Sequence, residues 1–258
     1  MQTINVRGIE FSNVNLDEAV DTAKNFIESP DKIPSVIFTP NSEIVQECID
    51  DKKAEKDSDV NLFEIVNSAS MIVPDGAGVV LASKILGTPL RQKVAGIDLA
   101  YRLIQYLDDT GKSLFLLGAT EEIVRMAQEK LNEQYKNLTV HINNGFFDKK
   151  SGSEENRAVI EKINQAAPDV IFVCFGLRKQ EVWIFENRSK LNAKLLIGLG
   201  GTIDDIAGVV KRAPKIFIKL NLEWFYRLIK DPSRIGRMMR LPKFIFGTWF
   251  YSLRKNKN

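Results

Sequence analysis

The sequence predicts an α/β fold in which a mostly parallel sheet carries helices on both faces. Apolar runs of strand length alternate with segments whose apolar residues recur at helical spacing, which is typical of strands joined by crossover helices. Residues 170–176 are apolar almost throughout, which indicates a strand buried on both faces. The chain of 258 residues is long enough for one large domain with an appendage. We therefore expect a Rossmann-like body followed by a helical C-terminal appendage.

The first expected elements are a hairpin and a helix. Residues 4–6 and 9–11 flank Arg7-Gly8, a sequence that suits a turn between antiparallel strands. Asn15 followed by Glu18 has the spacing of a capping box, in which each side chain accepts a hydrogen bond from the backbone of the other residue. Apolar residues recur at helical spacing from there to residue 27, so we expect a helix to begin at this box.

Two short strands then end at prolines. Residues 35–39 form a buried run stopped by Pro40, and Asn41 begins a helical pattern. Residues 71–73 form a second run stopped by Pro74, which removes a backbone donor and ends sheet pairing. The helical pattern that resumes at residue 79 runs to Gly87, a residue type common just past the end of a helix.

The rest of the body continues the alternation. Helical patterns occupy 98–107, 121–135, 154–166 and about 182–190, and strand patterns occupy 111–118, 138–142, 170–176 and 194–198. Since parallel strands end at one edge of their sheet, ligands of such folds bind in the crevice beyond those ends. The residues that follow each strand are therefore the candidates for function.

Asp75 is the most prominent of these candidates. It follows the strand at 71–73 and lies between Pro74 and Gly76, with Gly78 close by. Glycine at these positions lets backbone or ligand approach closely. A carboxylate in such a crevice is a candidate general base, and the alternative is that Asp75 only caps the helix that follows.

A glycine-rich turn follows the last strand. Gly200, Gly201 and Thr202 provide backbone amides that can cradle a phosphate, although tight packing explains such a turn equally well. The turn is not a dinucleotide fingerprint, because Ile203 stands where the third glycine is required. This disfavours an NAD-linked oxidoreductase.

The composition favours a reduced, cytoplasmic location. Cys48 and Cys174 lie within apolar patterns, the N-terminus has no signal-peptide core, and no apolar run is long enough to span a membrane. The single histidine, His141, cannot form a metal site with cysteines so far away in the chain. Asp57-Ser58-Asp59 has the D-x-D spacing that many sugar-nucleotide enzymes use to hold a cation, but it lies in a charge run typical of a solvated surface. We therefore expect no metal and no cofactor.

The last 48 residues differ from the rest in charge. Residues 211–258 hold 13 Lys or Arg and two acids, a net charge of +11, whereas residues 1–210 carry −8. Nine of the 23 aromatic residues also lie in this segment, where we expect helices over 219–230 and 233–240. We therefore divide the chain into a body, 1–210, and a basic, aromatic appendage, 211–258.

The appendage has the composition of a surface that docks on an anionic membrane. Aromatic residues beside Lys and Arg suit the membrane interface, and each basic residue near an anionic leaflet contributes roughly 1 kcal/mol. A dimer interface and a nucleic-acid patch are the alternatives. The density of Trp, Phe and Leu favours lipid over nucleic acid, because phosphate binding alone does not need so much apolar surface.

Several motifs together resemble one family. They are Thr39-Pro40-Asn41, Pro74-Asp75-Gly76, Lys179-Gln180-Glu181, Gly200-Gly201-Thr202 with Lys211-Arg212-Ala213-Pro214, and the segment 223–230. In this order and spacing they are similar to the WecG/TagA/CpsF glycosyltransferases over about residues 5–245. The resemblance implies inverting transfer of N-acetylmannosamine from UDP to the 4-hydroxyl of GlcNAc-diphospho-undecaprenol, without a metal, in the synthesis of the wall teichoic acid linkage unit.

The resemblance also implies roles for particular residues. Asp75 matches the base that takes the proton of the acceptor hydroxyl, and Thr39, Asn41 and Gln180 match residues of the same pocket. Gly200, Gly201, Thr202 and Asp204 would face the uridine diphosphate. Arg227, Arg234 and Arg237 match arginines that fold over the site and neutralise the departing diphosphate, a role that suits the arginine fork.

Two positions depart from the family pattern. Lys93, which the resemblance places among the substrate-binding residues, stands where the family has arginine before Val94-Ala95-Gly96, and an ammonium group cannot bind a phosphate bidentately. Arg178 stands where proline is usual, which either alters the pocket rim or adds a phosphate contact.

The resemblance implies as partners the UDP sugar, the lipid-linked acceptor and the inner face of the bacterial cell membrane, where the protein would be peripheral, with no nucleic acid. The donor remains open between N-acetylmannosamine and its uronic acid, and the oligomeric state remains open, a homo-oligomer being one alternative. A non-catalytic nucleotide-binding or nucleic-acid-binding module is the rival from another class; it would bind without releasing UDP.

Overall fold

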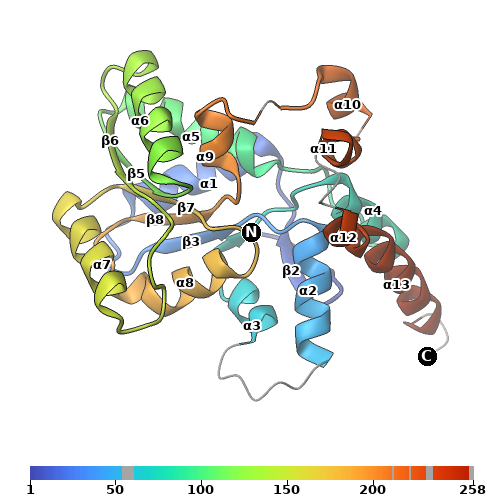
Figure 1. Ribbon diagram of the computed structural model, residues 1–258. Coiled ribbons are helices and arrows are strands. Elements are labelled where there is room, and N and C mark those ends of the chain that lie inside the picture. The colour runs from blue at the N-terminus through green and yellow to red at the C-terminus, as the bar shows by residue number, and fades with distance from the viewer. Residues whose placement is uncertain (54–60, 211, 221, 231–234, 256–258) are drawn as a thin grey trace.

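The computed structural model describes residues 1–53, 61–210, 212–220, 222–230 and 235–255 (Figure 1). Within these ranges the centre is a six-stranded sheet in the order β4-β3-β8-β7-β5-β6, and every neighbouring pair is parallel. The strands are β3 (Ser35–Phe38), β4 (Met71–Ile72), β5 (Ser113–Gly118), β6 (Thr139–Asn143), β7 (Val170–Cys174) and β8 (Leu195–Gly198). The predicted α/β fold with a parallel sheet is confirmed.

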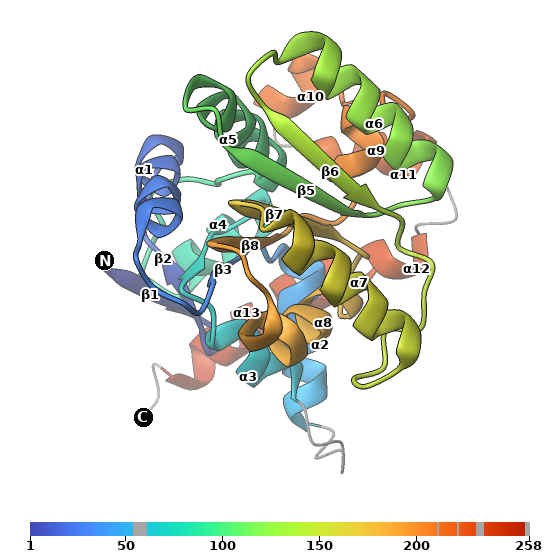
Figure 2. The ribbon, with the colours of Figure 1, turned by 90° about the vertical axis from the view of Figure 1, so that its left-hand side faces the viewer.

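Helices cover both faces of this sheet (Figure 2). Successive residues of a strand point to opposite faces. In β3, Ile37 belongs to the apolar cluster of one face, which includes residues of α1 (Leu16–Glu28), α5 (Gly96–Asp109) and α6 (Glu121–Gln134). Its neighbour Val36 belongs to the cluster of the other face, which includes residues of α3 (Leu62–Asn67), α7 (Glu154–Ala166) and α8 (Lys179–Asn187). The continuous apolar strands therefore serve two separate core layers.

A third apolar cluster lies beyond the β4 edge of the sheet. It joins the hairpin of β1 (Thr3–Val6) and β2 (Ile9–Ser12) with α2 (Ser42–Lys53), α4 (Ala77–Ile85) and α13 (Arg240–Lys255). Phe244 of α13 is fully buried in this cluster. The C-terminal helix is therefore packed into the core on one side.

Local signals in the sequence account for the first elements. Asn15 and Glu18 form the predicted capping box at the start of α1. In the hairpin turn, Arg7 and Gly8 have φ of 58° and 96°. A side chain at Gly8 would also lie 2.7 Å from the Phe63 ring, so the turn needs glycine for both its conformation and its packing.

The structure differs from the predicted elements at α3 and in the last 48 residues, where the helix α13 was also not predicted. The short helix α3 was not expected, because its six residues are too few to show helical periodicity. The helix predicted over 219–230 is wrong at its start, since α10 (Lys215–Lys219) ends before α11 (Glu223–Lys230) begins. The amide of Leu222 turns back to Phe217 O at 2.8 Å, which separates the two helices. A second helix was predicted over 233–240. The structure has α12 (Ile235–Met238) within this range, and residues 231–234 lie outside the described residues.

Candidate active site

The predicted site residues of the body follow four neighbouring strands. Thr39 and Asn41 follow β3, Asp75 follows β4, Gln180 opens α8 after β7, and the turn 200–202 follows β8. These strands are adjacent in the order β4-β3-β8-β7, and the carboxyl ends of parallel strands meet at one edge of the sheet. The structure therefore brings these residues together at one edge.

The carboxylate of Asp75 contacts a second loop. Asp75 Oδ2 accepts a hydrogen bond from the amide of Gly96 at 3.2 Å, at the first residue of α5. The N-cap of α4 is Gly76, with φ of 98°, and the described contact of the Asp75 carboxylate is with the start of α5. The backbone amide of Asp75 donates to Pro40 O at 3.3 Å, and this links the exits of β3 and β4.

Thr39 lies beside Gly96, the residue that donates to Asp75. Its hydroxyl donates to Gly198 O at 3.0 Å, which connects the exits of β3 and β8. A Cβ at Gly96 would lie 3.0 Å from Thr39 Oγ1, so glycine permits this close approach. Asp75, Gly96 and Thr39 therefore form one compact group.

Asn41 has a local structural role. Its Oδ1 accepts from the amides of Glu43 and Ile44 at 2.9 and 3.1 Å, so it caps α2. A Cβ at Gly76 would lie 3.9 Å from Asn41 Cβ, which puts Asn41 beside the turn after Asp75. Capping thus fixes Asn41 at the rim of the candidate site.

Gln180 accepts a hydrogen bond from the glycine-rich turn. It is buried, and its Oε1 accepts from the amide of Gly200 at 3.0 Å. Gly200 has φ of 55°, a conformation that favours glycine. Thr202 is also buried and donates its hydroxyl to Leu199 O at 2.8 Å, while Asp204 lies in the first turn of α9 (Thr202–Ile206), near Gly201. The turn is therefore fixed by its neighbours in the chain and by α8.

Glu181 is a residue to which the sequence gave no role. Its side chain is buried, and Oε1 accepts from Gln180 Nε2 at 2.9 Å. Among the described residues Oε2 has no hydrogen-bond partner. Burial raises the pKa of the Glu181 carboxyl to about 7. The motif 179–181 contained the signal, but only the packing of α8 reveals that this carboxyl is buried behind the site.

A charged cluster joins the appendage to the body. Lys93 Nζ lies 2.5 Å from Glu223 Oε2 on α11, and both side chains are partly buried. Arg212 forms a two-pronged contact with Asp98 of α5 at 2.6 and 3.0 Å, and this hydrogen bonding raises its pKa. Lys93, which the sequence placed among the substrate-binding residues, is therefore paired with a residue of the appendage.

The three predicted tail arginines lie largely outside the described structure. Arg234 falls within the undescribed segment 231–234. The backbones of Arg227 and Arg237 lie in α11 and α12, but their side chains are outside the described part of the chain. The D-x-D residues Asp57 and Asp59 are likewise outside it.

Two further features concern metals and membranes. Among the described residues there is no group of three or more His, Cys, Asp or Glu side chains that could hold a metal ion. In the same part of the chain, no helix combines the length and the apolar character needed to cross a membrane.

Arg178, the second departure from the family pattern, pairs with Asp51 of α2 at 3.0 Å.

Comparison with known proteins gives one consistent result. The model of a family described as "Glycosyl transferase WecG/TagA/CpsF family" matches residues 4–258. The chain is 35% identical over 243 residues to the N-acetylglucosaminyldiphosphoundecaprenol N-acetyl-beta-D-mannosaminyltransferase of Staphylococcus aureus strain MW2, covering 94% of this chain and 91% of that protein. The protein of the same name from strain NCTC 8325 matches with the same identity and coverage.

Proposed function

The chain belongs to the WecG/TagA/CpsF family of glycosyltransferases, and from this premise we propose that it transfers N-acetylmannosamine from UDP to lipid-linked GlcNAc. The acceptor is GlcNAc-diphospho-undecaprenol, its reacting group is the 4-hydroxyl, and the anomeric centre of the donor is inverted. The reaction is a step in the synthesis of the linkage unit of wall teichoic acid. The relatives that carry this activity in their name match nearly the whole chain, which supports the assignment.

Asp75 is the general base of the proposed reaction. Its carboxylate takes the proton of the acceptor hydroxyl while that oxygen attacks the anomeric carbon of the donor. The bond from the anomeric carbon to the diphosphate breaks, and UDP leaves with the electron pair. The observation that carries this role is the position of Asp75, which is partly buried where the exits of β3 and β4 are linked and α5 begins. The hydrogen bond from Gly96 fixes the carboxylate in place.

The donor lies against the exits of β8 and β7. The turn of Gly200, Gly201 and Thr202 would face the diphosphate, with Asp204 and Gln180 beside it. Because the amides of Gly200 and Thr202 donate to Gln180 Oε1 and Leu199 O, the backbone contact would come from the Gly201 amide. Support comes from the hydrogen bond between the Gly200 amide and Gln180 Oε1. This bond holds Gly200 in a left-handed conformation, and a turn of this kind exposes backbone to a ligand. Thr39 and Asn41 would contact the sugar between this turn and Asp75.

The appendage, residues 211–258, completes the site. Arg227, Arg234 and Arg237 would neutralise the diphosphate as negative charge develops on it, which is the kind of stabilisation that contributes most to group transfer. Their approach is supported by the contacts of Lys93 with Glu223 and of Arg212 with Asp98, which hold the first part of the appendage against the body.

The protein would act as a peripheral protein on the inner face of the cell membrane. Support comes from α13, whose exposed side chains include Phe246, Trp249, Phe250 and Tyr251. Aromatic side chains of this kind lie at the headgroup level of a bilayer. The acceptor is anchored in the same membrane.

A UDP-release assay with detergent-solubilised GlcNAc-diphospho-undecaprenol tests the proposal. We expect release with UDP-N-acetylmannosamine that depends on both the acceptor and Asp75. Release with the uronic acid donor alone would replace the donor assignment but keep the reaction class. Binding of UDP sugars without any release would point instead to a non-catalytic module.

A further inference from the structure

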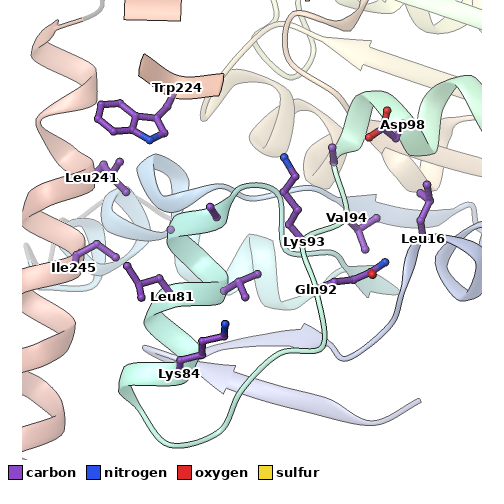
Figure 3. Close-up of a pocket in the computed structure, with 14 residues that line it drawn as sticks. Leu16, Leu81, Lys84, Gln92, Lys93, Val94, Asp98, Trp224, Leu241 and Ile245 are labelled. Atoms are coloured by element: carbon purple, nitrogen blue, oxygen red, sulfur yellow. The ribbon is translucent and has the colours of Figure 1, made fainter. Parts of the chain in front are cut away.

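A groove of about 750 Å³ runs along α4, next to the candidate active site (Figure 3). One wall is α4, the second is the segment 92–95, and the third is formed by α11 and α13 of the appendage. Its volume is typical of a small-molecule site. None of the groups assigned to the donor lines it.

The groove begins beside Asp75. Ala77 and Gly78 line its near end, two and three residues beyond the carboxylate. Ala77, Leu81 and Lys84 follow at helical spacing, so the α4 wall extends roughly 10 Å away from Asp75. Leu241 and Ile245 of α13 face this wall, and Trp224 of α11 covers the near end (Figure 3).

The lining combines apolar walls with cationic groups. Leu81, Ile245 and Trp224 are apolar, while Lys93 and Lys84 present ammonium groups. Lys93 is paired with Glu223, whereas Lys84 is exposed in the last turn of α4. A ligand matched to this lining carries an anionic group that reaches Lys84 and an apolar chain beyond it.

The apolar wall of the groove also continues outward. Trp249 follows Leu241 and Ile245 on the same face of α13 at helical spacing, and it is half exposed. A chain too long for the groove therefore meets further apolar surface on α13, at the part of the appendage that carries exposed aromatic residues.

We propose that this groove is the acceptor subsite, in which Trp224 contacts the acceptor sugar, Lys84 binds the diphosphate, and Ile245 and Trp249 contact the first isoprene units. The inference rests on the proposed function. It places the acceptor sugar at the near end, with its hydroxyl at Asp75, the diphosphate along α4, and the remaining chain leaving past Trp249. A nucleotide does not fit this surface, because it has no apolar chain to cover Ile245 and Trp249.

The test separates acceptor binding from donor binding. Lys84→Ala should raise the KM for the lipid-linked acceptor roughly tenfold or more, since one charge-assisted contact is lost, and leave the KM for the UDP sugar unchanged. Lys84→Arg, which keeps the charge, should restore most of the affinity. Lys136→Ala, an exposed lysine near the end of α6, is the matched control and should behave as wild type.

A second pair of measurements tests the apolar part. Trp249→Asn changes a half-exposed side chain of α13, so the fold is retained. We expect it to weaken an acceptor with a long isoprenoid chain severalfold more than one with a short alkyl chain. Equilibrium binding of both acceptors to the Asp75→Asn background provides the same comparison without turnover.

The outcomes are distinct. Unchanged acceptor affinity in both Lys84→Ala and Trp249→Asn, with an active wild type, overturns the groove assignment and leaves the proposed function intact. Absence of transfer by the wild type with every donor, together with absence of acceptor binding, overturns both. Loss of donor affinity in Lys84→Ala would place the nucleotide in the groove and also overturn the inference.

Discussion

Asp75 and Gly96, which are 21 positions apart in the chain, are joined by a hydrogen bond of 3.2 Å from the Gly96 amide to the Asp75 carboxylate. The contact brings the exit of β4 to the first turn of α5, where backbone amides lack partners within the helix. Thr39 packs against the same glycine. Asp75 is therefore held by backbone, and its function can be tested without removing the contact.

The first prediction concerns Asp75→Asn. The amide oxygen of Asn can still accept from Gly96, but Asn cannot take a proton, so turnover should fall by about 10² to 10⁴. Thermal unfolding should change little. Steady-state kinetics of UDP release, with Asp21→Asn on the exposed surface of α1 as control, provides the measurement. Turnover of the Asp75 variant close to wild type would remove the assignment.

The sequence was sufficient to predict the strands and the edge where the site lies. Continuous apolar runs mark buried parallel strands, and Pro40 and Pro74 mark where two of them end. The partner of Asp75 could not be predicted, because Gly96 reaches it through tertiary packing and not through local spacing. The start of α11 was missed because a local turn, closed by the hydrogen bond from the Leu222 amide to Phe217 O, interrupts the continuous amphipathic spacing.

The burial of Glu181 could not be predicted from the sequence either. In the sequence it is one acid in a motif, and acids are usually exposed. Its burial depends on how α8 lies beneath the turn after β8, with Gln180 between them. A buried carboxyl behind a site has a measurable consequence for stability.

The second prediction is a pH dependence from Glu181. Burial raises its pKa from 4.5 to about 7, so in this window the folded protein holds a proton that the unfolded chain has released. Stability therefore falls as the pH rises through the window, by at most about 3 kcal/mol above it. Glu181→Gln, which cannot ionise, should gain stability relative to wild type between about pH 5 and about pH 8.

Urea unfolding at both pH values measures this difference. Glu161→Gln, on the exposed surface of α7, is the control and should show no comparable change between the two pH values. An equal effect of Glu181→Gln at both pH values would contradict the prediction.

The third prediction concerns the link between body and appendage. Glu223→Gln removes the partner of Lys93 and weakens the contact with Arg212 Nε, which lies 3.7 Å from Glu223 Oε1. Both pairs are partly buried, so screening by water is limited and leaving a cation without its partner is costly. We expect faster proteolytic cleavage in the appendage and a severalfold loss of turnover.

Limited proteolysis and UDP release measure these two effects. Asp17→Asn breaks an exposed ion pair with Arg102 and is the matched control, because exposed pairs contribute little. If both variants are cleaved at the wild-type rate, the ion pairs with Glu223 do not hold the appendage.

The fourth prediction compares two phenylalanines of α13 that lie two positions apart. Phe244 is fully buried in the cluster with β1, β2, α2 and α4, whereas Phe246 is 63% exposed. Phe244→Ala should destabilise the protein by about 3 to 5 kcal/mol, the usual cost of emptying a packed aromatic site. Phe246→Ala should leave the free energy of unfolding within about 0.5 kcal/mol of the wild-type value and weaken binding to anionic vesicles.

Urea unfolding and vesicle co-sedimentation are the two measurements, and each variant is the control for the other. The proposed membrane contact requires the two effects to separate, because one face of α13 belongs to the core and the other is free to meet lipid. Loss of stability without loss of vesicle binding in Phe246→Ala would contradict it.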